Sequence, residues 1–141
     1  MDGTAKLWSL WSAKWLVTAR LLERRVNVLA LDTDMLEFTD PYPSLRAPPV
    51  SHYQLVLPAE GGRVNLGFIY VRGAEMAAGG GASSVFWDVV RRFRLFSEQW
   101  TLLNRSGKSS MQGIWDQGLF TDALVSAARE EHVYSYTYLQ S

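Results

Sequence analysis

The sequence lacks cysteine, so it can form neither a disulfide nor a thiolate metal site. It also lacks an excess of either charge, because 14 Lys and Arg residues balance 14 Asp and Glu residues. A neutral chain has no overall field that would steer it onto nucleic acid or an acidic membrane, so we expect no nucleic-acid partner. No run of about 18 apolar residues is present, nor a basic segment followed by an apolar one. The sequence therefore predicts a soluble chain without a membrane span or a secretory signal.

Apolar and aromatic side chains are abundant. They make up 48% of the sequence and include six Trp, six Tyr and six Phe residues. Disordered chains lack such side chains, so this composition predicts a packed, aromatic-rich core. A length of 141 residues is typical of one domain.

Three segments carry apolar residues at steps of three or four, which is the spacing of an amphipathic helix. They are residues 4–25, residues 85 onward and residues 116–130. Asp116 stands at the N-cap position of the last of these. In the second, Arg91, Arg92 and Arg94 fall largely outside the apolar face, which predicts a solvated basic face.

Strands are predicted where apolar residues run together or alternate with polar ones. These segments are residues 26–31, 53–57, 64–72 and 133–139. We expect the first to be fully buried and the third to be central. Turn and loop residues fill 40–52, and a glycine-rich surface loop is predicted over 73–84. Helices between strands indicate an α/β fold.

Two carboxylates, Asp32 and Asp34, follow the first predicted strand directly. Ligands of open α/β sheets bind at such strand ends. On an extended strand, residues two apart share a face and lie about 6.6 Å apart at Cα, so both carboxylates can lean toward one cation. Mg²⁺ and Mn²⁺ take oxygen ligands and often share them with substrate phosphates. The pair therefore predicts a metal–phosphate site.

The carboxylate pair belongs to one of three separated motifs. They are residues 28–34 (VLALDTD) with Asp40-Pro41 behind them, residues 65–72 (NLGFIYVR) and residues 116–124 (DQGLFTDAL). In order and approximate spacing they resemble the nucleotide-diphospho-sugar transferases, a family with plant and algal arabinosyl-, xylosyl- and galactosyltransferase-like members. These enzymes build cell-wall polysaccharides and hydroxyproline-rich glycoproteins. The resemblance implies that residues 1–141 form a single, partial glycosyltransferase A-type domain, with a Rossmann-like mixed sheet and flanking helices.

The resemblance also implies roles for individual residues. Asp34 is the expected direct ligand of Mn²⁺ or Mg²⁺, and Asp32 binds the metal or the hydroxyls of the donor. Asn65, Gly67 and Arg72 belong to the donor-binding set, where a glycine permits close approach of the sugar.

Asp116 and Gln117 are the expected catalytic residues, facing the sugar or the acceptor. The implied reaction moves a sugar from a nucleotide-sugar donor to a glycan or glycoprotein hydroxyl, with retention at the anomeric carbon and no assigned nucleophile. The implied location is the Golgi lumen.

The chain also departs from the family pattern. Upstream of Trp8 we expect no room for the strand and helix that hold the nucleoside base, since that unit needs about 30 residues. Thr121-Asp122 stands where the family commonly has asparagine, and little follows His132 to supply a third metal ligand. These departures favour a second hypothesis, a non-catalytic remnant that binds a partner or a glycan.

Other interpretations remain for the same residues. A phosphohydrolase would use Asp32 as its nucleophile, although Leu36 stands where such enzymes carry Thr or Val. The two aspartates could instead be solvated in a turn or paired with Arg63 or Arg72. Asp116 could act as an N-cap alone.

Overall fold

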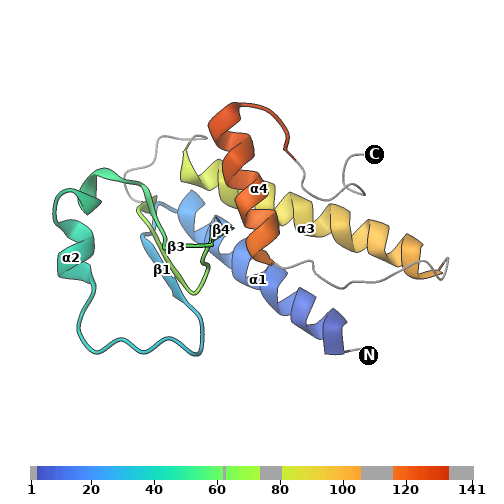
Figure 1. The fold of residues 1–141 in the computed structure, drawn as a ribbon, viewed down its shortest axis with the longest axis horizontal. Helices are drawn as coiled ribbons and strands as arrows, with labels where there is room; N and C mark the ends of the chain where they lie inside the picture. The colour runs from blue at the N-terminus through green and yellow to red at the C-terminus, as the bar shows by residue number, and fades with distance from the viewer. Residues whose placement is uncertain (1–2, 62, 74–80, 106–115, 134–141) are drawn as a thin grey trace. The chain divides into compact units, whose positions relative to one another are not determined.

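The computed structural model describes residues 3–61, 63–73, 81–105 and 116–133. It is a mixed α/β structure in which packing divides the chain into two compact units. The helical unit comprises residues 1–17 and 85–141, and the sheet unit comprises residues 18–84. Figure 1 shows the elements of both. The strand predicted over 133–139 and most of the predicted glycine-rich loop lie outside the described residues, and the single domain stays a prediction.

The helical unit is built from helices predicted by apolar periodicity. They are α1 (Gly3–Glu23), which continues into the sheet unit, α3 (Ala82–Arg105) and α4 (Asp116–Arg129). Trp15 of α1, Phe86 of α3 and Phe120 of α4 are fully buried, and their ring centroids lie 5.2 to 6.0 Å apart. Such tilted and edge-on ring pairs are favourable packing arrangements. The predicted aromatic core is therefore confirmed in this unit.

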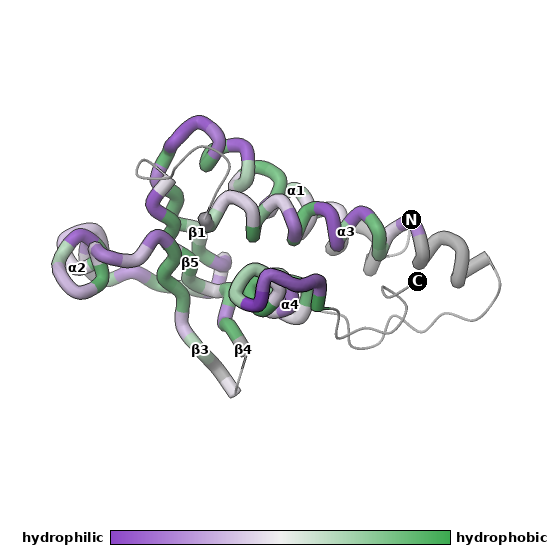
Figure 2. The backbone as a smooth tube through the Cα atoms, turned by 90° about the horizontal axis from the view of Figure 1, so that it is seen from above, coloured by the Kyte–Doolittle hydropathy of each residue, from purple (hydrophilic) through white to green (hydrophobic). Residues whose placement is uncertain are grey.

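The predicted solvated basic face of α3 is wrong for one of its three arginines. Arg91 and Arg94 are exposed, but Arg92 is fully buried. Arg92 lies three residues after Val89 and four before Phe96, so it stands on the apolar stripe that α3 buries. Burial of its charge is possible because Asp88, one turn earlier, pairs with it at 2.7 Å. Figure 2 shows hydrophilic and hydrophobic residues alternating along α3.

The sheet unit holds a three-stranded sheet of order β1-β5-β2. Its strands are β1 (Val28–Leu31), β5 (Phe68–Val71) and β2 (Leu55–Val56), and both pairings are antiparallel. β5 is central and largely buried, which confirms the prediction of a central strand within residues 64–72. β1 is only half-buried, because among the described strands it lies at the edge and pairs with β5 alone. The expectation of a fully buried first strand is therefore wrong.

Short elements occupy the predicted turn and loop segment 40–52 and the stretch before the predicted strand 64–72. They are α2 (Tyr42–Arg46), the 3-10 helix η1 (Val50–His52) and the hairpin of β3 (Ala59–Glu60) and β4 (Arg63–Val64). Pro41 precedes α2, and the Tyr42 N–H donates to Asp40 Oδ1 at 2.9 Å. The ring of Tyr42 packs edge-on against Tyr70 of β5. A five-residue helix has too few turns to show a period, so tertiary packing rather than pattern defines α2.

Candidate metal and phosphate site

The site lies where β1 ends and β5 begins. In the antiparallel register Leu31 faces Phe68, and the Asp32 N–H donates to the Gly67 carbonyl at 2.9 Å. This bond extends the ladder by one residue pair beyond the two strands. Two motifs far apart in the sequence thus become neighbours at one end of the sheet.

Gly67 forms the floor of this site. A Cβ on Gly67 would lie 3.0 Å from Asn65 Oδ1 and 3.7 Å from both Asp32 Oδ2 and Met35 Sδ. The Gly67 N–H donates to Asn65 Oδ1 at 2.7 Å, which orients the amide of Asn65. Because Gly67 has no side chain, Asn65 Oδ1 can lie closer to it than a Cβ would normally allow, while Asp32 Oδ2 is at ordinary contact distance from that position. The structure therefore brings together three of the predicted donor-binding residues.

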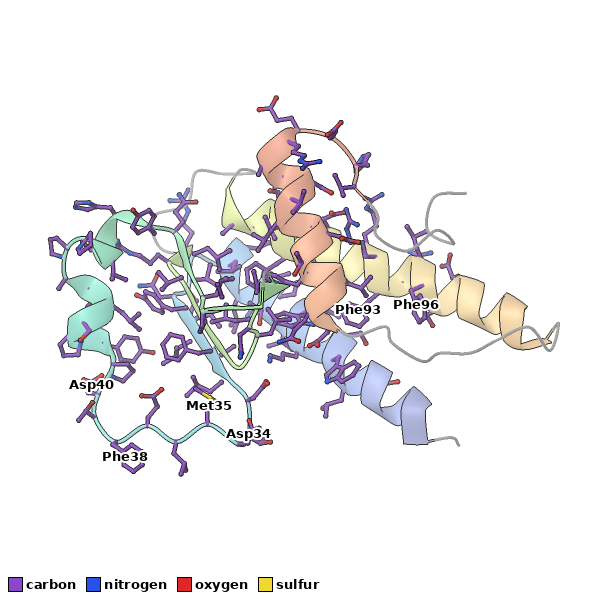
Figure 3. All side chains as sticks on the ribbon, in the orientation of Figure 1. Asp34, Met35, Phe38, Asp40, Phe93 and Phe96 are labelled. Atoms are coloured by element: carbon purple, nitrogen blue, oxygen red, sulfur yellow. The ribbon has the colours of Figure 1, made fainter. Side chains whose placement is uncertain are left out.

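Asp34 does not continue the extended strand on which it was predicted to share a face with Asp32. The Met35 N–H donates to the Asp32 carbonyl at 3.1 Å, which closes a turn with Thr33 and Asp34 at its central positions. The chain is therefore no longer extended after Asp32, and the shared strand face predicted for the two aspartates is wrong. Both are exposed, and Asp34 stands at the start of the loop that leads to α2 (Figure 3).

Asp32 and Asp34 are the two predicted carboxylate ligands of a metal ion. Within the described residues, no group of three or more His, Asp or Glu side chains is arranged to hold a metal. Mg²⁺ and Mn²⁺ sites that act on phosphates commonly use one or two protein carboxylates, with phosphate and water oxygens completing the shell. The metal-binding roles of Asp32 and Asp34 stay predictions.

Arg72 is not brought into this group. It follows β5, and its N–H donates to the Gln54 carbonyl at 2.8 Å. At about 3.3 Å per residue, the five residues from Gly67 to Arg72 span roughly 17 Å of strand. The register pairs Val71 with Val28, so Arg72 lies beside the beginning of β1 rather than its end. Arg63 was the other suggested ion-pair partner of the two aspartates. Its side chain is not among those that the structure describes.

Asp116 and Gln117 begin α4 in the helical unit, whereas Asp32, Asn65 and Gly67 belong to the sheet unit. The Gln117 N–H donates to Asp116 Oδ1 at 2.9 Å. The carboxylate therefore accepts from one of the N–H groups that have no partner inside the helix. Asp116 is the first residue of α4 and its bond goes to the next residue, so the N-cap role also stays a prediction. The catalytic roles of Asp116 and Gln117 stay predictions.

The sequence analysis missed a buried polar cluster around Arg92 in the helical unit. Its guanidinium donates to Asp88 Oδ2 at 2.7 Å, to the Val133 carbonyl at 2.7 Å and to Ser126 Oγ at 2.8 Å. Asp122 Oδ2 lies 4.0 Å away. The available signal was the position of Arg92 on the apolar stripe with an aspartate four residues before it. The cluster joins α3, α4 and the segment after α4.

Together these units define an α/β protein with a small antiparallel sheet and a carboxylate site at one end of it. No protein-family model matches the chain, and no curated protein or solved structure matches it either. None of the helices in the described ranges combines the length and the apolar character that crossing a membrane requires.

Proposed function

We propose that this chain is the metal- and diphosphate-binding part of a glycosyltransferase. The reaction moves a sugar from a nucleotide-sugar donor to a hydroxyl of a glycan or glycoprotein, with retention at the anomeric carbon. One observation carries the proposal. The carboxylate of Asp32, the amide of Asn65 and the bare backbone of Gly67 meet at one end of the sheet.

The chemistry of these groups suits a nucleotide sugar. Mn²⁺ or Mg²⁺, when bound, would stabilise the charge that develops on the leaving nucleoside diphosphate. Asp32 and Asp34 would hold this ion. The amide of Asn65 can bond sugar hydroxyls, and Gly67 leaves room for a sugar ring to approach the backbone.

We also propose a fold family and a cellular location for this chain. The sheet unit would be part of a glycosyltransferase A-type domain, and the protein would act in the Golgi lumen during cell-wall biogenesis. The resemblance of the three motifs supports both statements. The described strands pair only antiparallel, and a mixed sheet would also contain parallel pairs.

Calorimetric titration of the whole chain tests the proposal. The titrants are Mn²⁺ alone, and then nucleoside diphosphates and nucleotide sugars with Mn²⁺ present. Asp32→Asn and Asp34→Asn should each weaken metal-dependent nucleotide binding by at least about tenfold, because a site with two protein ligands loses one. Asp40→Asn is the matched control, since Asp40 is an exposed aspartate of the same loop.

Each result separates the alternatives. Binding lost in both variants and kept in the control supports the transferase. No binding by the folded wild-type chain contradicts the transferase and favours a non-catalytic remnant. Release of phosphate from a phosphomonoester, abolished by Asp32→Asn, would instead identify a phosphohydrolase.

A further inference from the structure

The loop that joins β1 to α2 displays large apolar side chains in solvent. Phe38 is 90% exposed and Leu36 is 77% exposed. In Figure 3, Phe38 projects from this loop, and Met35 lies nearer the sheet, where its Sδ approaches Gly67. Single exposed apolar residues are common on proteins, but two such residues within three positions form a local apolar surface.

The same loop is acidic throughout. Residues 32–40 contain four carboxylates, Asp32, Asp34, Glu37 and Asp40, and all four residues are exposed. No Lys, Arg or His residue occurs between Arg25 and Arg46 in the sequence. The local field therefore attracts cations and repels anionic lipid headgroups and nucleic-acid phosphates.

Arg46, the next basic residue along the chain, does not neutralise this loop. Its guanidinium carbon lies 5.2 Å from the ring centroid of Tyr42, in cation–π geometry. Asp40 has a structural bond, since Oδ1 accepts the Tyr42 N–H at 2.9 Å. Its carboxylate thus holds a defined position at the start of α2.

We propose that residues 34–40 form a docking site for a basic polypeptide segment that carries an apolar side chain beside its lysines or arginines. Phe38 is the apolar anchor, because exposed aromatic rings provide large contact area and attract cations to their faces. Glu37 and Asp40 supply charge complementarity at the rim, which favours association and selects against acidic partners. The negative charge of the loop favours a basic segment over an anionic membrane surface as the partner. The inference is independent of sugar transfer.

The test measures binding of a fluorescein-labelled dodecapeptide with five lysines around one central leucine, with glycine and serine elsewhere. Phe38→Ser should weaken binding about tenfold, the loss expected for an anchor residue. The double variant Glu37→Gln and Asp40→Asn should weaken it about fivefold, since each exposed ion pair contributes only modestly. It should also reduce the salt dependence of binding. Asparagine at position 40 keeps an oxygen acceptor for the Tyr42 N–H.

Two control variants make the same kinds of change, loss of an exposed aromatic residue and loss of two exposed carboxylates, outside residues 34–40. Tyr53→Ser removes an aromatic residue of the sheet unit that is 60% exposed. Glu130→Gln with Glu131→Gln removes two exposed carboxylates after α4. Both controls should bind the peptide within about twofold of wild type, because neither changes a residue of the loop and exposed charges each contribute little. Circular dichroism checks the fold of every variant.

Three outcomes would overturn the proposal. They are equal loss of binding in the controls, equal binding of a peptide with serine in place of lysine, and binding of phosphatidylserine vesicles by wild type that Phe38→Ser abolishes. The result is separable from the proposed transferase, because Glu37→Gln with Asp40→Asn leaves both expected metal ligands in place. Failure of peptide docking with intact Mn²⁺-dependent nucleotide binding would reject only the docking site.

Discussion

Replacing Arg92 with methionine should destabilise the helical unit strongly. The Arg92 side chain is fully buried and donates to Asp88, to the Val133 carbonyl and to Ser126 at 2.7 to 2.8 Å. Methionine fills much of the same volume but donates to none of them. Asp122, with a side chain only 4% exposed and 4.0 Å from the guanidinium, would lose its nearby cation. Removing one partner of a buried ion pair typically costs about 3–5 kcal/mol, and we expect a loss of this size.

The matched control is Arg94→Met on the same helix. Arg94 pairs with Glu98 at 2.9 Å, but the two side chains are 82% and 56% exposed. Pairs with this exposure contribute about 0.3–0.5 kcal/mol, so the control should unfold almost as the wild type does. Urea unfolding followed by circular dichroism and tryptophan fluorescence gives both free energies of unfolding. A loss below about 1 kcal/mol for Arg92→Met would refute the reasoning, because truncation would then leave no costly buried group.

A second variant covers the case in which Arg92→Met does not fold. Arg92→Lys keeps the positive charge but has a single ammonium in place of the planar guanidinium fork. It should retain the pairing with Asp88 and lose at least one of the bonds to Ser126 and Val133. We expect an intermediate loss of about 1.5–3 kcal/mol, the contribution of a hydrogen bond to a charged group. A lysine variant as stable as wild type would show that charge alone matters here.

Four substitutions at three positions of the sheet unit test its local geometry by thermal unfolding. Asn65→Ala should cost about 1–3 kcal/mol, because the N–H of buried Gly67 loses its acceptor, and Asn65→Asp should largely restore stability. Gly73→Ala should destabilise more than any exposed alanine substitution, because its Cβ would overlap the Val26 carbonyl. Gly61→Ala should cost only about 1–2 kcal/mol, since its φ is +55° but nothing lies within 4 Å. Equal losses for the two glycine variants would contradict the predicted overlap at Gly73.

The long elements could be predicted from the sequence because each buries one continuous face. α1 and α4 repeat apolar residues at helical spacing, and the structure has them at Gly3–Glu23 and Asp116–Arg129, close to the predicted 4–25 and 116–130. β5 lies within the predicted strand 64–72 because a central strand is apolar on both faces. These patterns need no knowledge of partners.

The burial of Arg92 and of β1 could not be predicted from apolar periodicity, because it depends on tertiary contacts. Arg92 was placed in solvent with Arg91 and Arg94, outside the apolar face of the helix. In the structure, Ser126 and the Val133 carbonyl accept hydrogen bonds from its guanidinium, and the Asp122 carboxylate lies 4.0 Å away. The half-burial of β1 reflects its place at the edge of the sheet, which its apolar sequence does not reveal. In both cases, burial depends on which segments pack against the residue, and the local sequence does not specify those segments.

The direction of one strand pairing decides which residues share the site. A parallel pairing would bring the ends of β1 and β5 together and place Arg72 next to Asp32. The observed antiparallel pairing places the beginning of β5 at that end, so Gly67 and Asn65 meet Asp32 and Arg72 lies at the other end. At that end of the sheet, the neighbours that the register gives Asp32 are therefore the uncharged Gly67 and Asn65 instead of an arginine. The metal–phosphate interpretation of the Asp32-Thr33-Asp34 motif therefore depends on this register as much as on the motif itself.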